Sequence, residues 1–315
     1  MKRIFFKTLL GLALCMSLSV TTSLAHAEYN PKLLRIGFQK SASLLTLVKA
    51  QGALEKRFSA QGVEVKWVEF PAGPQLLEGL NVGAIDFGYV GEAPPIFAQA
   101  AGASFVYVGY EEPSPGAEAI LVPKGTTIQR VADLKGKKVA LNKGSNVHYL
   151  LVKLLEKHGL KYADIQPVFL APADARAAFE RGSVDAWVIW DPYAAAAEKQ
   201  IDARILADGK GVVNNYQYFL AERQFAAKRA DVIRQLFEEL QTQGQWINKN
   251  YKEAATKLAV LQGLDAAIVE QSIRRSSNNI KAINGPVLTD QQKIADTFLE
   301  LKLIPKEIKV KDASL

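Results

Sequence analysis

Short apolar strands alternate with amphipathic helices along the first two thirds of this chain. A first series of strands is expected at residues 33–38, 63–70, 85–90 and 105–110, and a second at 119–122, 138–141, 166–170 and 185–190. Apolar helical stripes separate most of them, at residues 44–58, 75–81, 96–101, 145–158, 172–181 and 192–199. Such alternation is typical of largely parallel sheets with helices on both faces, so the sequence predicts an α/β fold.

Two breaks in this alternation predict how the chain divides. The segment 111–116, rich in proline, separates the two series, and the segment 209–215 leads to one more strand at 217–221. The rest is nearly all helical, with helices expected at 232–250, 253–261, 266–276 and 290–302. We therefore expect a first lobe that begins with 28–113, a second lobe of 114–212, and a return to the first lobe in 213–315. Two crossovers are the connectivity of a hinged binder that closes on its ligand.

An internal repeat supports two similar lobes. Residues 83–93 align without gaps with residues 182–192, and each copy holds a glycine, an aspartate, a strand and a carboxylate that opens the next helix. Glu92 and Asp191 take the same place in the two copies. In open α/β sheets, ligands lie outside the carboxyl ends of the strands. The repeat therefore indicates one ligand cleft that the strand ends of both lobes face.

Two polar turns that follow buried strands suit an anion. In the stretch 139–151, Gly144 allows a tight turn, and Ser145 is expected to cap the next helix with its hydroxyl. The first strand is followed by a similar turn, in which Ser41 or Ser43 is the expected cap. Free amides and the positive dipole end of a helix attract anions. The alternative interpretation is that both are ordinary capped helices.

The first residues predict an export signal. A short basic start is followed by the apolar run Leu9–Val20 and by the small-x-small pattern Ala25-His26-Ala27. We place the cleavage after Ala27, so that the mature chain begins at residue 28. Cys15, the only cysteine, leaves with the signal. A lipoprotein start at Cys15 is the weaker alternative, because the residue before it is not small.

The composition of the mature chain excludes several classes of function. Loss of the three basic residues of the signal lowers the formal net charge from +7 to +4, and the remaining basic residues are scattered, so no nucleic-acid surface is predicted. His148 and His158 are the histidines that remain, which makes no metal cluster. Ser145 and His148 lack a nucleophile elbow and a third catalytic member, and no Walker-type loop is present. We expect a binding protein without cofactor, metal or catalytic residues.

Several motifs resemble one known family. Residues 67–75, 94–102, 143–145, 172–179 and 190–193 look like the periplasmic aliphatic sulfonate-binding protein of an ABC importer, and the likeness runs in order through most of the chain. The resemblance implies a two-lobe periplasmic-binding-protein fold of type II, in which hydrogen bonds and helix N-termini hold a sulfonate between the lobes. It also implies a periplasmic monomer that delivers its ligand to an ABC permease and its ATPase.

The resemblance and the repeat nominate the site residues. They are Gln39, Ser41, Glu92, Pro94, Gly144, Ser145, Asn146, Trp190 and Asp191. Gln39, Ser41 and Ser145 are expected to bond the sulfonate oxygens together with backbone amides, because a permanently charged sulfonate needs fixed donors and no proton transfer. Trp190 would either pack against the tail of the ligand or serve as a core tryptophan at a strand end.

Two of these residues fit poorly beside an anion. Glu92 and Asp191 are expected to cap helices or to pair with an arginine such as Arg176. Alternatively, one of them meets a ligand ammonium, as in taurine.

Together, these features predict a solute-binding protein that captures aliphatic sulfonates for import in sulfur acquisition. The alternatives are the same scaffold with taurine, nitrate or a pyrimidine precursor of thiamine, and an enzyme such as a desulfinase. The absence of a mature cysteine argues against a thiol nucleophile. Segments 88–90, 91–95 and 215–218 depart from the family pattern, some with bulkier residues, and leave the preferred tail of the ligand open.

Overall fold

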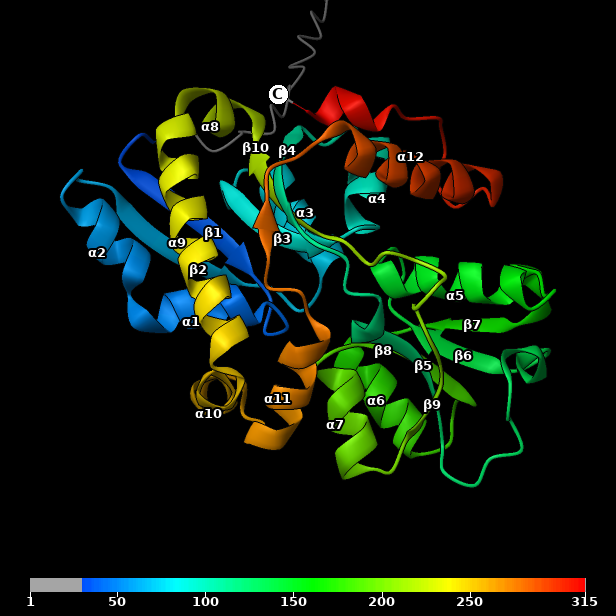
Figure 1. Ribbon diagram of the computed structural model, residues 1–315. Coiled ribbons are helices and arrows are strands. Elements are labelled where there is room, and N and C mark those ends of the chain that lie inside the picture. The colour runs from blue at the N-terminus through cyan, green and yellow to red at the C-terminus, as the bar shows by residue number, and fades with distance from the viewer. Residues whose placement is uncertain (1–29, 315) are drawn as a thin grey trace, which may run out of the picture.

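Two β-sheets organise the computed structural model, which describes residues 30–314 (Figure 1). The predicted export signal, its cleavage after Ala27 and the alternative lipoprotein start at Cys15 lie outside the described residues. Between residues 30 and 314, none of the helices has the length and apolar character needed to cross a membrane.

The first sheet combines parallel and antiparallel strands. Its strands are β1 (Leu33–Phe38), β2 (Glu64–Glu69), β3 (Phe87–Gly91), β4 (Phe105–Glu111), β10 (Gln217–Glu222) and β11 (Ile280–Lys281). They lie in the order β11-β4-β10-β3-β1-β2. Strand β1 is parallel to β2 and β3, whereas β10 runs antiparallel between β3 and β4. The strand after the second crossover thus returns to the first sheet.

The second sheet is built from the middle of the chain. It contains β5 (Glu118–Val122), β6 (Lys138–Leu141), β7 (Gln166–Phe169), β8 (Ala186–Trp190) and β9 (Arg204–Asp208), in the order β7-β6-β8-β5-β9. Strand β6 is parallel to β7 and β8, and β5 is antiparallel to β8 and β9. The sequence patterns do not predict β9, because this edge strand is half-buried along its whole length and its short apolar run, 205–207, lies between charged residues.

Helices cover both sheets. The helices of the two series are α1 (Ser43–Gln51), α2 (Ala53–Ser59), α3 (Gly73–Asn81), α4 (Pro94–Ala100), α5 (Asn146–Lys157), α6 (Pro172–Glu180) and α7 (Tyr193–Gln200). The C-terminal helices are α8 (Arg223–Lys228), α9 (Ala230–Lys249), α10 (Tyr251–Gln262), α11 (Ala266–Arg275) and α12 (Gly285–Glu300). Figure 1 shows α8 and α9, in yellow, beside the first sheet, and α11, in orange, next to α7 of the second.

Two helix boundaries differ most from the prediction. The apolar stripe 44–58 is divided at Gly52, whose φ of +60° ends α1 before α2 begins. Helix α12 begins at Gly285 rather than Asp290, because the side-chain oxygen of Asn284 accepts a hydrogen bond from the N–H of Val287. Local capping sets both boundaries, and the apolar stripe of a helix does not indicate where such a cap lies.

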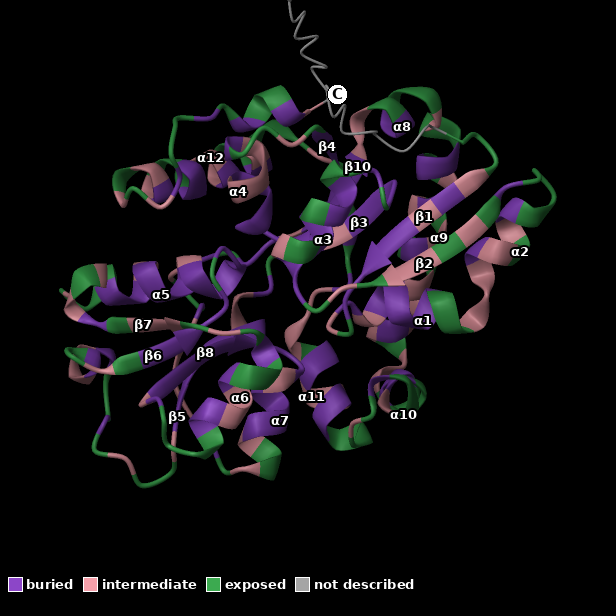
Figure 2. Ribbon diagram, turned by 180° about the vertical axis from the view of Figure 1, so that it is seen from behind, coloured by how far each residue is buried: buried purple, intermediate pink, exposed green. Residues whose placement is uncertain are grey.

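Each sheet has a separate hydrophobic core (Figure 2). Trp187 and Leu150 are fully buried in the core of the second sheet, whereas Phe87 and Tyr218 lie in two cores of the first. A small apolar contact joins the two halves, where Ile268 of α11 packs against alanines of α7. The separate cores of the two sheets therefore leave polar strand ends and loops between the sheets.

Candidate functional site

A cleft lies where residues from both sheets and both crossovers meet. It contains about 560 Å3 of space, open solvent included. The first sheet and its helices contribute Gln39, Ser41, Gly73, Tyr89, Gly91, Pro94, Glu111 and Gln217. The second contributes Ser145, Asn146, Trp190 and Asp191, and the crossovers and the end of α11 contribute Ser114, Ala117, Asn215 and Ser276.

Most of the predicted site residues lie together in this cleft. Those that line it are Gln39, Ser41, Pro94, Ser145, Asn146, Trp190 and Asp191. The sequence predicts Trp190 either to contact the ligand or to lie in the core. Its side chain belongs to the core of the second sheet, is 8% exposed and also borders the cleft.

Two predicted residues do not line the cleft. Gly144 forms the turn before α5 with φ +75°, as expected, and faces the ring of Phe97 instead. Glu92 is buried behind the cleft, where its Oε2 accepts a hydrogen bond from the N–H of Tyr216 at 2.8 Å. The expectation that Glu92 caps a helix is therefore wrong, because its carboxylate is bonded to an amide of the second crossover rather than of α4.

Helices that pack on the first and on the second sheet begin at the cleft. Ser41 precedes α1, and Ser145 precedes α5. Pro94 opens α4 and has no N–H to donate, and Gly73, the first residue of α3, also lines the cleft. The starts of α1 and α5 place positive dipole ends on both sides of the cleft.

The expected serine caps are not formed. Ser145 has the N-cap position of α5, but its hydroxyl donates a hydrogen bond to the carbonyl oxygen of Asn142 at 2.7 Å. At α1, the N-cap residue is Ala42, so neither Ser41 nor Ser43 caps the helix with its side chain. Because the hydroxyl of Ser145 turns back to its own loop, the first-turn amides of α5 are left for a ligand.

Removal of the Ser145 hydroxyl is expected to have a small effect. Ser145→Ala loses one neutral hydrogen bond, which corresponds to about 1 kcal/mol in the free energy of unfolding measured by urea denaturation. The backbone amides of α5 stay in place, so the dissociation constant of a sulfonate should change less than about fivefold. The control is Ser59→Ala, whose hydroxyl makes a similar bond to Lys56 on the surface. Loss of binding in Ser145→Ala alone would show that the hydroxyl contacts the ligand directly.

Asn146 connects α5 to the second sheet and to the second crossover beside the cleft. Its Nδ2 donates to Oε2 of Glu118 at 2.6 Å and to Oδ1 of Asn215 at 2.9 Å. The Nδ2 of Asn215 in turn donates to the carbonyl oxygen of Ser114 at 2.9 Å. Asn146 thereby links α5 to both crossovers. Gly91 packs so closely against Asn146 that an added Cβ would lie 2.7 Å from its Oδ1.

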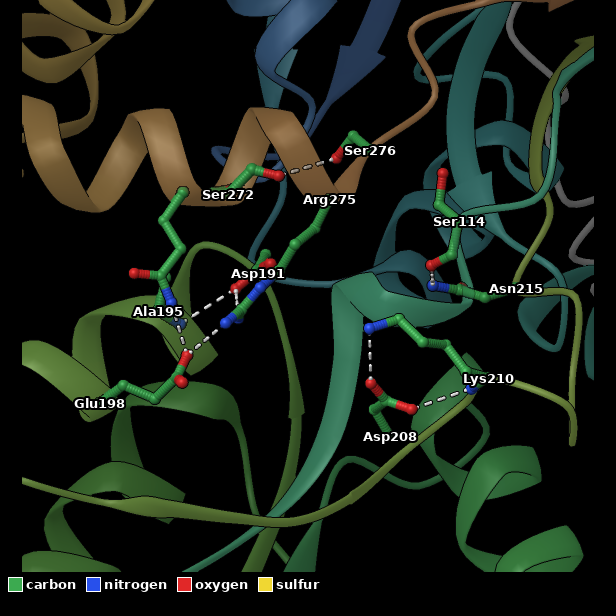
Figure 3. Close-up of polar contacts among 11 residues, drawn as sticks. Ser114, Asp191, Ala195, Glu198, Asp208, Lys210, Asn215, Ser272, Arg275 and Ser276 are labelled. Atoms are coloured by element: carbon green, nitrogen blue, oxygen red, sulfur yellow. Dashed lines mark hydrogen bonds and ion pairs between the residues drawn. The ribbon is translucent and has the colours of Figure 1, made fainter.

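Asp191 is held by a partner from the far end of the chain (Figure 3). Its Oδ1 accepts a hydrogen bond from the N–H of Ala195 at 3.0 Å, so the predicted contact with a helix start is confirmed. Arg275 of α11 lies 3.5 Å from the same oxygen and 2.8 Å from Glu198. The prediction that Asp191 pairs with Arg176 is wrong, because Arg176 forms its ion pair with Glu180 inside α6. Burial raises the pKa of Asp191 to about 6, although Arg275 lowers it.

Glu111 is a second buried carboxylate of the cleft. It is 3% exposed, and its Oε2 accepts a hydrogen bond from the hydroxyl of Tyr89 at 2.7 Å. Burial raises the pKa of Glu111 to about 7, while the bond from Tyr89 lowers it. Glu111 and Asp191 are the charged side chains in the lining that the described residues provide.

Neutral donors dominate the rest of the lining. Amides and hydroxyls come from Gln39, Ser41, Asn215 and Gln217, and within the described residues neither lysine nor arginine lines the cleft. The described residues also hold no group of histidine, cysteine and carboxylate side chains that suits a metal ion. The arrangement can bind an anion through fixed dipoles and hydrogen bonds without a proton transfer.

Several cleft residues are missed by sequence reasoning. They are Gly73, Tyr89, Gly91, Glu111, Ser114, Ala117, Asn215, Gln217 and Ser276. Glu111 and Ser114 begin the first crossover, and Asn215 and Gln217 end the second. Because crossovers run past the cleft in a two-lobe fold, polar residues beside them are the signal that could have identified this group.

Comparison with known proteins identifies the family. A family described as NMT1-like matches residues 27–262. The chain belongs to this family. An aliphatic sulfonates-binding protein of Escherichia coli (strain K12) is 45% identical to this NMT1-like protein over 97% of this chain and 95% of its own length. The solved alkanesulfonate-binding protein from Xanthomonas axonopodis pv. citri, bound to MOPS, is 43% identical, with a TM-score of 0.86 over 91% of this chain and 99% of its own.

These matches confirm the resemblance and the α/β fold class with two sheets. The relatives with high identity are named as binding proteins and not as enzymes. A solved desulfurization enzyme also matches the NMT1-like chain, with a TM-score of 0.66 over 90% of this chain and 96% of its own, but at 15% identity. That similarity shows a shared fold alone.

Proposed function

We propose that this NMT1-like protein is an exported solute-binding protein that captures aliphatic sulfonates in the periplasm and delivers them to an ABC permease and its ATPase. The observation that carries the proposal is a cleft between two sheets that offers two helix N-termini and a set of uncharged donors to one ligand. The names of the relatives with high identity point to the same class of ligand.

The roles of the site residues follow from their positions. Amides at the start of α1 and α5 bind the sulfonate oxygens, and the side chain of Gln39 adds a neutral donor. The Nε2 of Gln39 already donates to the carbonyl oxygen of Tyr89 at 3.1 Å, which fixes the direction of its side chain and leaves its second N–H for the ligand. A sulfonate remains ionised at every pH at which the protein is folded, so fixed donors are sufficient.

The two lobes are proposed to be 28–113 with 213–315, and 114–212. The first set supplies the first sheet and the second set supplies the second. Two chain crossings at the hinge allow the lobes to rotate about the ligand. Cleavage after Ala27 and a monomeric state belong to the same proposal.

A thermal-shift panel on residues 28–315 tests this function. The panel contains ethane-, hexane- and benzenesulfonate, sulfate, nitrate and a hydroxymethylpyrimidine. A ligand that binds the folded state alone stabilises it by about 2.7 kcal/mol at a hundredfold excess over its dissociation constant. We expect the sulfonates to raise the melting temperature and the other compounds to leave it unchanged. A shift with the pyrimidine or nitrate alone would overturn the sulfonate assignment.

Trp190 is expected to determine how the tail of the ligand is held. Trp190→Ala removes an aromatic wall of the cleft, so the affinity for hexanesulfonate should fall by about tenfold or more, since burial of an apolar side chain is worth about 1.5–3 kcal/mol. Methanesulfonate should lose less than about threefold by the same calorimetric measurement. Trp246→Ala, which removes a half-buried tryptophan of α9, is the control. Equal losses for both sulfonates would assign Trp190 to the core alone.

A further inference from the structure

Helix α11 packs against elements of both sheets through two different sides. Val269 and Ile273, four residues apart, are fully buried in a core of the first sheet. Ile268 packs instead against alanines of α7, a helix of the second sheet. Residues three or four apart lie on the same side of a helix, so Gln271 and Arg275 share the side of Ile268. The polar residues of this side therefore meet α7.

Two polar side chains of α11 reach across to the second sheet. Gln271 donates a hydrogen bond to Oε2 of Glu198 at 2.8 Å. Arg275 donates to the same oxygen at 2.8 Å and lies 3.5 Å from Oδ1 of Asp191, as Figure 3 shows. Glu198 lies in α7, and Asp191 directly follows β8. Both ion pairs of Arg275 thus join a helix of the first sheet to elements of the second.

Asp191 places a carboxylate in the lining of a cleft that is proposed to bind an anion. It is buried, and its Oδ2 makes no hydrogen bond with any described residue. Burial raises its pKa to about 6, so most of the group is ionised at pH 7.5. Two negative charges repel each other more strongly in a buried site than in water. The cleft therefore needs a cation that offsets the charge of Asp191.

Arg275 is placed to provide this compensation from behind the lining. It ends α11, where the partial negative charge of the helix C-terminus favours a cation. The next residue, Ser276, lines the cleft, whereas Arg275 itself does not. Glu198 shares the guanidinium, but its side chain is 22% exposed and is screened by water, whereas the side chain of Asp191 is 2% exposed. The arginine therefore matters most to the carboxylate in the cleft.

We propose that Arg275 is a positioning residue that holds and neutralises Asp191, so that the cleft accepts a sulfonate. This inference rests on the proposed function and concerns the same cleft. Because α11 belongs to the core of the first sheet and Asp191 to the second, the compensation is complete only while the two sheets are packed together. Movement of the proposed lobes away from each other separates Arg275 from Asp191 and thereby weakens the hold on the anion.

Titration calorimetry with ethanesulfonate at pH 7.5 tests this role. Arg275→Gln removes the cation, so the affinity should fall by about tenfold or more. Arg275→Lys keeps a cation beside Asp191 and should stay within about threefold of the wild-type protein. In the Asp191→Asn background there is no carboxylate to compensate, so Arg275→Gln should then change the affinity by less than about threefold. Arg274→Gln, which removes an arginine that pairs with Glu270 inside α11, is the control and should leave the affinity unchanged.

Each result has a defined meaning. An affinity that Arg275→Gln leaves within threefold overturns the compensation. A tenfold loss in Arg275→Lys, or one that persists in the Asp191→Asn background, also overturns it, because such a loss comes from packing. The Asp191→Asn comparison leaves no buried carboxylate at this position, so it stands even where Arg275→Gln alone does not fold. Failure of the wild-type protein to bind ethanesulfonate contradicts the proposed function itself.

Discussion

Raising the pH from 5 to 8.5 is expected to lower the contribution of Glu92 to the free energy of unfolding by about 3–5 kcal/mol. This side chain is 1% exposed, and its Oε1 makes no hydrogen bond within the described residues. Burial raises its pKa from 4.5 to about 8, against the opposing effect of the hydrogen bond from the N–H of Tyr216. The carboxyl group of Glu118 is close enough to disfavour a second charge.

The sign follows from where the proton is bound. The folded state holds a proton on Glu92 up to a pH of about 8, whereas the unfolded chain releases it near pH 4.5. The stability that this group contributes is therefore complete below pH 4.5 and is lost as the pH rises to about 8. Burial also raises the pKa of Glu111 to about 7 and that of Asp191 to about 6. The stability that these two groups contribute is likewise lost as the pH rises, but over lower pH ranges.

Urea denaturation at several pH values measures this loss. Glu92→Gln keeps an oxygen that can accept from Tyr216 but has no proton to release, so its stability should fall less steeply and exceed that of the wild-type protein at pH 8.5. Glu300→Gln, an exposed carboxylate at the end of α12, should follow the wild-type curve. A wild-type stability that is constant or rises over this interval would contradict a neutral buried Glu92.

Asn146→Ala is expected to lower both stability and affinity. The variant leaves Oε2 of Glu118, which is fully buried, without its donor, whereas Oδ1 of Asn215 keeps the hydrogen bond from Nε2 of Gln217 at 2.9 Å. An unsatisfied buried acceptor costs about 1–3 kcal/mol, so the free energy of unfolding should fall by about 1–3 kcal/mol. Since Asn146 also borders the cleft at the start of α5, the affinity for sulfonates should fall at least tenfold.

A double-mutant cycle isolates the contact between α5 and the second crossover. Asn146→Ala and Asn215→Ala remove the same hydrogen bond, so their combined effect should be smaller than the sum by about 1 kcal/mol or more. Asn81→Ala, at the exposed end of α3, should change stability by less than about 0.5 kcal/mol and serves as the control. Additive effects of the two central variants would show that the bond has no energetic role.

Most helices and strands were predictable because the sequence pattern that indicates each one lies within its own residues. Apolar runs mark β6 and, with Arg35 as an interruption, β1, and an apolar stripe with the helical period marks α5 after Gly144. The patterns miss β9 and the two-residue β11, which lie at sheet edges and bury too little to leave a pattern. Tertiary pairing alone makes these segments strands.

The candidate site was predictable where it follows strand ends. Gln39, Ser145 and Asp191 come directly after strands or their turns, so the topology rule for α/β sheets placed them at the cleft. Glu92 follows a strand as well, but its side chain points to the second crossover instead. The position in the repeat determines where the backbone of a residue lies relative to the strand end. The packing around the residue determines which way its side chain points.

By itself, the sequence determined the alternation of strands and helices, the two crossovers, the positions of the helix N-termini and the family. The tertiary structure decided which distant groups meet. Arg275 reaches Asp191 across 84 positions of the chain, and Asn146 joins Glu118 to Asn215 across both crossovers. Local periodicity reflects the backbone geometry of one element at a time, whereas these contacts depend on how two sheets and a C-terminal helix pack together.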